Sequence, residues 1–340
     1  MPKRNQKRRN GKEINPREQN GTDASQSGGS RLTVYQEVTG RIIAELEAGR
    51  VPWVQPWSST ARGASVGLPV NAQTGKTYSG INILLLWGQV LERDFAVQSW
   101  LTYKQAQTLG GNVRKGETST PIVYADSFTP KGERKAAREE NRDPQRIPFL
   151  KRYRVFNIDQ CDHLPRGLYA QAPDLPQCEQ LPIAEKLIKA TAADFRIGGN
   201  RAYYVPGEDY IQVPPQPLFH AQIDYYRTCF HELGHWTGAR HRLDRPMETS
   251  KGSKLYAREE LVAEMTSAFV CASLGIVPTV RHADYIGAWL DVLRADDKAI
   301  FRAASKASKA ADYILAFHGE AGPKNDPESG PEREAESGAA

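Results

Sequence analysis

Cysteine is scarce in this chain of 340 residues: there are four, and no two of them form a C-x-x-C pair. That spacing argues against a disulfide framework, so we expect reduced thiols in a cytoplasmic protein. Long apolar runs are also missing. The most apolar stretch, residues 81–87, is far shorter than the roughly 20 residues of a transmembrane helix. No apolar segment follows the basic N-terminus, so neither a secretory signal nor contact with a membrane is predicted.

Apolar side chains are rare at both ends of the chain. Residues 1–30 and 319–340 cannot bury enough surface to offset the entropy lost on ordering, so we expect a disordered basic arm and a disordered acidic tail. Their net charges are +4 and −4, whereas residues 31–168 carry +6 and residues 169–318 carry −1. The first half of the chain is therefore the half expected to meet a polyanion.

The length favours two domains, and a proline-rich stretch between them suggests where they meet. We expect a domain at residues 31–168, a linker at 169–182 and a second domain at 183–318. The fold class predicted for the whole is α+β. The first domain should be a small α+β unit, and the second should be mostly helical with one β-hairpin.

Hydrophobic periodicity places several elements within these domains. A helix is expected over residues 32–49, because apolar residues recur there every fourth position. Strands are expected at 121–128 and 153–158, with the charged insertion 131–146 as a hairpin tip. In the second domain we expect a hairpin at 201–213. Helices should follow from residue 221, around residues 259–275, and at 284–293 and 295–317.

An H-E-x-x-H motif begins at His231. Its spacing of four puts His231 and His235 on one helix face, where both imidazoles can reach one metal ion. Glu232 is placed beside that face, as the general base that takes a proton from water. Tyr256 could polarise an oxyanion there, although a tyrosine in this position is more often a packing residue.

A catalytic zinc site needs a third protein ligand, and the sequence offers three candidates. Glu260 and Glu264 lie one helical turn apart, so one of them could bind the metal while the other orients a histidine. We favour Glu260 as the ligand and Glu264 as its supporting residue. Glu264 remains an alternative ligand. His241 is another, because His231 to His241 has the metzincin spacing with Gly238 at the turn. Zinc suits this donor set best, and manganese or another divalent ion is the alternative.

Aromatic and basic residues occur together in irregular parts of the first domain. Such a combination suits bases stacked on rings and phosphates held by cations. The stacking candidates are Trp53, Trp57 and Tyr78. The phosphate candidates are Lys76, Arg114, Lys115, Lys151 and Arg152.

Several longer strings resemble the ArdC family of plasmid antirestriction proteins, across residues 31–318. In the first domain they are YQEVTGRIIAELEAGRVPWVQPW, NAQTGKTYSGIN and WLTYKQAQTLGGNVRKGE, and in the second CFHELGHWTGARHRLDR and YAREELVAE. The first domain is also similar to the N-terminal part of plasmid conjugative primases. The E-L-V-A-E string is similar to the E-x-x-A-[DE] helix of gluzincins, and this similarity implies that Glu260 binds zinc and Glu264 orients a histidine.

The resemblance implies a single-stranded-DNA-binding domain followed by a metallopeptidase-like domain. It also implies that the protein protects incoming plasmid DNA from host restriction during conjugation. A second hypothesis is a zinc metalloprotease that cleaves a host protein, such as a restriction subunit, and uses the DNA-binding domain only for targeting. A third is a binding module with a purely structural metal, because intact ligands do not prove turnover.

Overall fold

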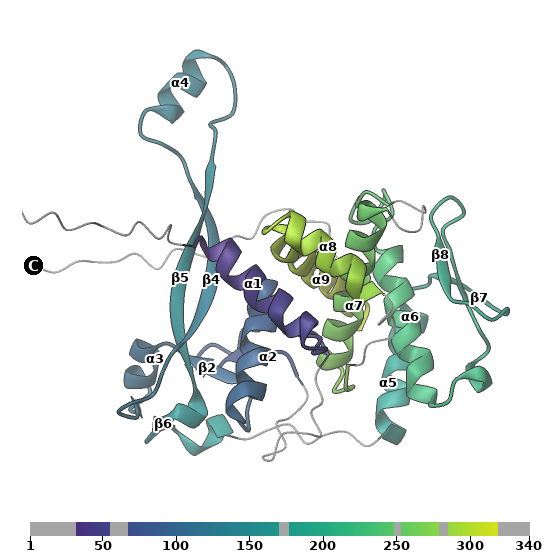
Figure 1. Cartoon of the computed structure of the whole chain (residues 1–340), viewed down its shortest axis with the longest axis horizontal. Helices are drawn as coiled ribbons and strands as arrows, with labels where there is room; N and C mark the ends of the chain where they lie inside the picture. The colour runs from purple at the N-terminus through teal and green to yellow at the C-terminus, as the bar shows by residue number, and fades with distance from the viewer. Residues whose placement is uncertain (1–31, 55–66, 170–176, 248–252, 279–284, 319–340) are drawn as a thin grey trace, which may run out of the picture. The chain divides into compact units, whose positions relative to one another are not determined.

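The computed structural model describes residues 32–54, 67–169, 177–247, 253–278 and 285–318. The α+β class predicted from the sequence is confirmed (Figure 1). The first half contains α1 (Val34–Glu47), β1 (Val70–Asn71), α2 (Ile81–Arg93), β2 (Ser99–Leu101), α3 (Tyr103–Thr108), β3 (Asn112–Val113), β4 (Thr120–Phe128), α4 (Glu133–Glu139), β5 (Ile147–Asn157) and β6 (Cys161–Asp162). The second half contains α5 (Gln177–Ala190), β7 (Asp194–Ile197), β8 (Tyr203–Val205), β9 (Tyr210–Val213), α6 (Gln222–Trp236), α7 (Lys254–Ser273), α8 (Ile286–Ala295) and α9 (Ala299–Leu315).

Helix α1 shows how local sequence fixes an element. Thr33 accepts a hydrogen bond from the backbone N–H of Gln36, whose side chain accepts one from the backbone N–H of Thr33. This capping box satisfies two N–H groups that a helix start otherwise leaves unpaired. Val38, Ile42 and Leu46 then form the buried stripe of the helix, as the periodicity predicts.

The first half is built on a four-stranded sheet in the order β1-β2-β5-β4. Strand β1 runs parallel to β2, and the other neighbours are antiparallel. A smaller pair, β3 and β6, lies beside it. Helix α2 is almost entirely apolar from Ile83 to Trp87 and packs against β4.

Strands β4 and β5 pair along nine successive positions, from Thr120↔Val155 to Phe128↔Ile147. They form a hairpin that extends beyond the helices, with α4 at its far end (Figure 1). The sequence predicts β5 only from residue 153, and it predicts a hairpin tip for the charged insertion without assigning a helix to it. In fact β5 begins at Ile147, and the charged insertion contains α4.

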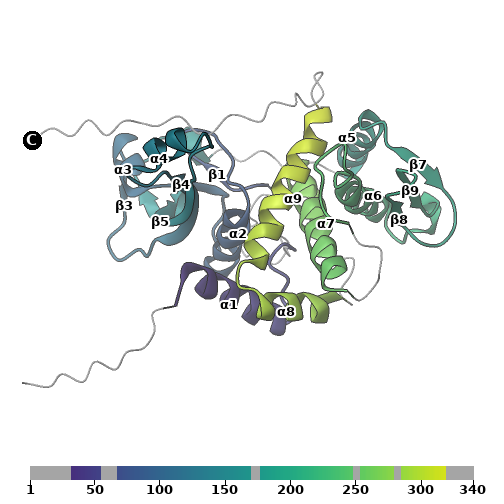
Figure 2. The ribbon, with the colours of Figure 1, turned by 90° about the horizontal axis from the view of Figure 1, so that it is seen from above.

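The second half combines a three-stranded sheet with helices. Strand β9 lies between β8, which is antiparallel to it, and β7, which is parallel to it. The β8–β9 hairpin was predicted, but β7 was not. Helix α6 packs on this sheet and on α7, and α7 packs on α9 (Figure 2).

The two halves share one hydrophobic core. Trp53 packs against Trp289 of α8 with ring centroids 5.3 Å apart, and Trp87 packs against Phe269 of α7 at 5.8 Å. The described chain from Thr33 onward forms one compact unit. Of the expected linker, residues 170–176 lie outside the described residues, and α5 already begins at Gln177. The expected disordered arm and tail also lie outside them. No helix of the described segments is long and apolar enough to cross a bilayer.

Candidate metal centre

Helix α6 presents two imidazoles side by side. His231 and His235 are one turn apart, and their Nε2 atoms lie 3.2 Å from each other. Glu232, between them in sequence, is buried with only 4% of its surface exposed. Spacing and helical geometry together therefore produce the paired donors that the motif predicts.

Glu260 of α7 brings a carboxylate to the same point. Its oxygens lie 3.6 Å from Nε2 of His231 and 3.5 Å from Nε2 of His235. Three ligand atoms bound at about 2.1 Å to a tetrahedral ion are separated by about 3.4 Å. The distances of 3.2, 3.5 and 3.6 Å, the last two to different oxygens of Glu260, are of this size, so the three side chains can share one ion.

The other ring nitrogens also face carboxylates of α7. Nδ1 of His231 lies 3.6 Å from Glu264, and Nδ1 of His235 lies 3.5 Å from Glu259. A carboxylate at Nδ1 fixes the tautomer that leaves Nε2 as the metal donor. Helix α7 thus supplies one candidate ligand and one supporting acid for each histidine.

Glu259 is itself held by a buried arginine. Arg245 makes two hydrogen bonds to the Glu259 carboxylate, at 2.6 and 3.2 Å. It also donates to Oγ1 of Thr237 at 2.8 Å and to the carbonyl of Gly234 at 2.6 Å. A fork with this many fixed partners leaves the carboxylate little freedom to turn. Arg245 therefore locks the acid that orients His235.

Four buried carboxylates give this region an excess of negative charge. They are Glu232, Glu259, Glu260 and Glu264. Burial works to lower the pKa of His235, but hydrogen bonds to Glu259 and Glu260 outweigh it and raise that pKa to about 10. Burial likewise opposes the charged form of Glu260, yet hydrogen bonds from both histidines hold the pKa of Glu260 well below its usual range. The site therefore stabilises positive charge between these side chains, and a divalent ion would supply it.

Tyr256 stands one helical turn before Glu260. Its hydroxyl lies 3.2 Å from the hydroxyl of Tyr285. Burial, the hydrogen bond with Tyr285 and the nearby charge of Glu260 all raise the pKa of Tyr256. The phenol therefore stays protonated and can donate a hydrogen bond to an oxygen atom.

A glycine lets the two helices approach each other. A Cβ atom at Gly234 would lie 3.1 Å from Cα of Ala263 and 3.3 Å from Cβ of Thr266. Both contacts are tighter than ordinary packing, so a side chain at Gly234 would push α6 and α7 apart. Gly234 is thus required for the distances between the two histidines and Glu260.

His241, the alternative third ligand, does not belong to this cluster. Its side chain is 64% exposed, and its Nε2 lies 3.3 Å from Asp209 and 2.6 Å from Arg242. The group of potential ligands among the described residues consists of His231, His235 and Glu260.

The sequence did not single out Glu259 or Arg245. Glu259 directly precedes Glu260, so an acid at that position was visible. Its role depends on Arg245, which is 14 residues away and meets it only in the folded chain. The basic run after His241 was the signal for Arg245, and its burial could not be read from the pattern.

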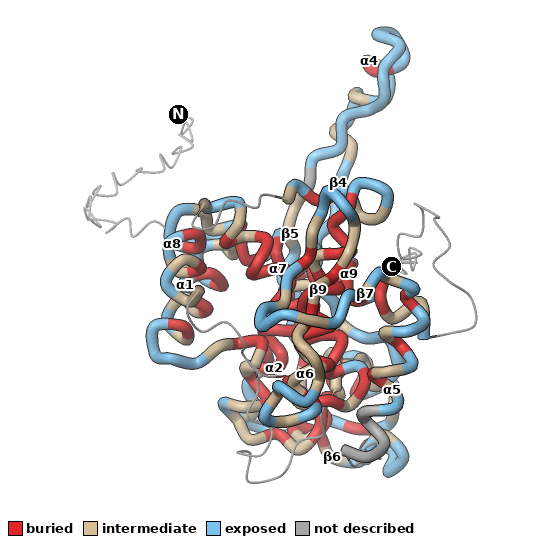
Figure 3. The backbone as a smooth tube through the Cα atoms, turned by 90° about the vertical axis from the view of Figure 1, so that its right-hand side faces the viewer, coloured by how far each residue is buried: buried red, intermediate tan, exposed pale blue. Residues whose placement is uncertain are grey.

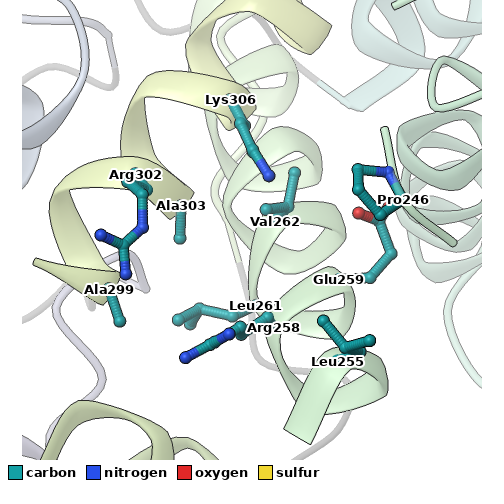
Figure 4. A pocket seen from close by; sticks show the side chains of 10 residues that line it. All are labelled: Pro246, Leu255, Arg258, Glu259, Leu261, Val262, Ala299, Arg302, Ala303 and Lys306. Atoms are coloured by element: carbon teal, nitrogen blue, oxygen red, sulfur yellow. The ribbon is translucent and has the colours of Figure 1, made fainter. Parts of the chain in front are cut away.

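A pocket of about 120 Å³ lies between α7 and α9, and Glu259 is one of its lining residues (Figure 4). Arg258, Arg302 and Lys306 give it a basic lining, and the side chain of Lys306 points toward Val262. Arg258 and Arg302 both pair with Asp296. The pocket adjoins the residue that orients His235, but the three candidate ligands are not among its lining residues.

The phosphate candidates all lie on the surface, but two of them already have acidic partners. Arg114 pairs with Glu117 at 2.8 Å and with Asp162 at 3.6 Å. Arg152 pairs with Glu37 at 2.7 Å. The three lysines among the phosphate candidates, Lys76, Lys115 and Lys151, are exposed.

The structure describes two of the three stacking candidates, Trp53 and Tyr78. Trp53 has no exposed surface and packs on Trp289, so the prediction that it stacks on bases is corrected: it is a core residue that joins the two halves. Trp57 lies outside the described residues. Tyr78 is half-buried, and burial raises the pKa of its hydroxyl.

Comparison with known proteins relates each half of the chain to a known domain family. The family model for a zincin-like metallopeptidase matches residues 182–306, and that for the N-terminal domain of anti-restriction factor ArdC matches residues 33–156. The metal-free crystal structure of the antirestriction ArdC protein from plasmid R388 is 39% identical, with a TM-score of 0.70 over 84% of this chain and 98% of that one. The chain belongs to the ArdC family of antirestriction proteins. The family resemblance and the two-domain organisation predicted from the sequence are thereby confirmed.

Further matches cover a similar share of this chain. The Mn(II)-bound R388 ArdC structure has a TM-score of 0.69 at 39% identity, and covers 85% of this chain and 99% of that one. The uncharacterised protein y4eC of Sinorhizobium fredii is 38% identical over 85% of this chain and 93% of its own length. A DNA primase TraC of Escherichia coli is 39% identical over 83% of this chain, which corresponds to only 27% of the primase. The zincin-like domain and its His/His/Glu cluster imply a divalent metal ion.

Proposed function

We propose that this ArdC-family protein is a cytoplasmic antirestriction factor that binds single-stranded DNA and protects incoming plasmid DNA during conjugation. The observation that carries the proposal is the joint match of both domains and of nearly the whole R388 ArdC chain. The charge distribution supports it, because the ArdC N-terminal domain lies in the basic half of the sequence. Phosphate contacts would come from the exposed lysines Lys76, Lys115 and Lys151. Arg114 and Arg152 would contribute if a phosphate replaced the carboxylates with which they pair.

Zinc is the metal we propose for the cluster, held by His231, His235 and Glu260. Two imidazoles and a carboxylate suit zinc, and the Mn(II)-bound relative supports manganese as a second choice. The bound ion would supply Lewis acidity. Glu232 is placed to accept a proton from water, and Tyr256 to donate a hydrogen bond to a carbonyl oxygen. Glu259 and Glu264 keep both imidazoles in the orientation that this chemistry needs.

The second candidate function is a metallopeptidase that acts on a host protein, such as a component of the restriction system. Two features favour it over a purely structural metal: Glu232 is buried in the motif, and the Tyr256 hydroxyl lies close enough to Glu260 for that carboxylate to help raise the pKa of Tyr256. Neither residue is needed to hold an ion. A purely structural metal site needs neither a base nor a hydrogen-bond donor beside its ligands.

A plasmid-transfer assay separates the two functions. Plasmids carrying the wild type or Glu232→Gln would be transferred into restricting and non-restricting recipients. If the peptidase does the protecting, Glu232→Gln loses protection in the restricting recipient, while its thermal stability and DNA binding match the wild type. If DNA binding does the protecting, the variant protects fully. Failure of the wild type itself to protect would refute the antirestriction proposal.

A further inference from the structure

The β4–β5 hairpin carries a large share of the exposed apolar side chains of the described residues. Among the described residues, eleven large apolar side chains are exposed, and four of them are on this hairpin: Tyr124, Phe128, Ile147 and Tyr153. A two-stranded ribbon that extends from the body buries little, and its outer part is exposed along most of its length (Figure 3). An exposed apolar patch of this kind usually marks a surface that binds something.

The strand register gathers the aromatic side chains on one face. Tyr124 is opposite Lys151, and Phe149 is opposite Asp126, which is two residues further along β4. Since alternate residues of a strand share a face, Phe128 and Tyr153 join them. Four aromatic rings and Lys151 therefore follow a single face of the ribbon, together with Asp126 and Ile147. Arg152 lies on the other face, where it pairs with Glu37 of α1.

The rings form two pairs on this face. Tyr124 and Tyr153 have centroids 6.0 Å apart and are nearly perpendicular at 88°. Phe128 and Phe149, nearer the tip, also have centroids 6.0 Å apart. Lys151 lies between the pairs along β5, with its Nζ 6.0 Å from the centroid of the Tyr153 ring. We call these five residues the hairpin platform.

The hairpin is also basic. Residues 120–157 carry nine Lys and Arg and five Asp and Glu, a net charge of +4. Lysines and arginines continue into α4 at the tip, as Lys135 and Arg138 show. A positive ribbon that carries flat aromatic rings is complementary to a polyanion with exposed bases.

We propose that the hairpin platform is the surface on which single-stranded DNA binds, with bases on its rings and a phosphate at Lys151. This inference rests on the proposed DNA-binding function and adds the contact surface. The two rings on each strand are four residues apart, a separation of about 13 Å, which is roughly four times the 3.4 Å rise per base of a duplex strand. Rings with this spacing therefore suit bases that are spread apart, so the platform selects single strands over duplex.

The test is fluorescence anisotropy of the full-length protein with a labelled oligothymidylate. The double variant Tyr124→Ala/Tyr153→Ala removes one ring pair, and we expect its Kd to rise by roughly 5- to 150-fold per lost base stack. Tyr124→Phe/Tyr153→Phe keeps the rings and should bind like the wild type. Tyr203→Ala, an exposed tyrosine on β8, is the matched control and should also bind normally.

Salt dependence tests the lysine separately. Lys151→Ala should make the slope of log Kobs against log salt shallower by about 0.7, the value for one phosphate on a single strand. The ring variants should leave the slope unchanged. If the wild type does not bind oligothymidylate, the proposed DNA-binding function fails. If the wild type binds and Tyr124→Ala/Tyr153→Ala binds equally well, only the platform is refuted. Loss of protection with normal DNA binding in that variant would also refute it and indicate a protein partner.

Discussion

Oε1 of Glu259 lies 3.5 Å from Nδ1 of His235, and Arg245 holds the same oxygen at 2.6 Å. The chain Arg245–Glu259–His235 therefore ends at the imidazole whose other nitrogen faces Glu260. The orientation of a candidate ligand thus depends on an arginine that follows the motif by ten residues.

Replacing Glu259 should weaken metal binding without removing a ligand. We expect Glu259→Gln to raise the Kd for Zn²⁺ or Mn²⁺ by roughly 10- to 100-fold, because the amide no longer fixes the charge and orientation at Nδ1 of His235. Isothermal titration calorimetry on the metal-stripped protein measures this effect. Glu139→Gln, on the exposed surface of α4, is the control and should not change the affinity. Equal affinities for Glu259→Gln and the wild type would show that Glu259 does not support the site.

Removing the metal should destabilise the protein. Adding Zn²⁺ or Mn²⁺ at 100 times its Kd should stabilise the stripped protein by about 2.7 kcal/mol, because the unfolded chain lacks the assembled site. Thermal melts with and without metal measure the shift. His231→Gln should lose the metal-dependent shift, while His220→Gln, an exposed histidine outside the cluster, should keep it. A shift of equal size in His231→Gln would place the ion elsewhere.

The close approach of α6 and α7 should make Gly234 intolerant of a side chain. We expect Gly234→Val to cost about 1–3 kcal/mol and to weaken metal binding, because its methyl groups would collide with Ala263 and Thr266. Gly40→Ala is the contrast, since nothing lies within 4 Å of a Cβ atom there. That exposed position in α1 should gain about 0.5–1 kcal/mol from better helix propensity. Urea denaturation of both variants tests the pair, and unchanged stability in Gly234→Val would contradict the packing argument.

Asp209 should make the stability of the β8–β9 turn depend on pH. Its carboxylate pairs with Arg242, accepts a hydrogen bond from Tyr204 and faces His241. Burial works to raise the pKa of Asp209, but the hydrogen bonds from Arg242 and Tyr204 outweigh it and hold that pKa below its usual value. A lowered folded-state pKa gives a contribution that is complete above the unfolded-state pKa, near 4, and is lost as pH falls through the folded-state value.

Asp209→Asn should therefore cost about 1 kcal/mol at pH 7, a charged hydrogen bond reduced by partial exposure. The difference from the wild type should stay constant down to about pH 4 and shrink below it. Urea denaturation at pH 7, 5, 4 and 3 measures this trend. A difference that is absent at pH 7, or that grows toward pH 3, would contradict the assigned pairing.

The sequence predicts the parts of the site that depend on local spacing. His231 and His235 meet because a helix repeats every 3.6 residues, and Glu260 and Glu264 share a face for the same reason. What escapes prediction depends on contacts distant in sequence. Strand β7 is only four residues long, Asp194–Ile197, and is held by parallel pairing with β9. Helix α4 forms within a highly charged insertion that has little apolar periodicity.

Trp53 shows the same limit in the opposite direction. Its neighbours include prolines and a second tryptophan, a context typical of an exposed binding loop. Its partner, Trp289, is more than two hundred residues away in the sequence. Only the folded chain shows that the ring fills a core rather than a binding surface.

The contact between Trp53 and Trp289 also affects how genetic data on this protein should be interpreted. Since residues of both halves enter one core, the chain from Thr33 onward should unfold in a single cooperative step. A substitution deep in the zincin-like half can then abolish DNA binding simply by lowering the population of folded molecules. A loss-of-function allele therefore identifies a functional domain only after the folded fraction of its product has been measured.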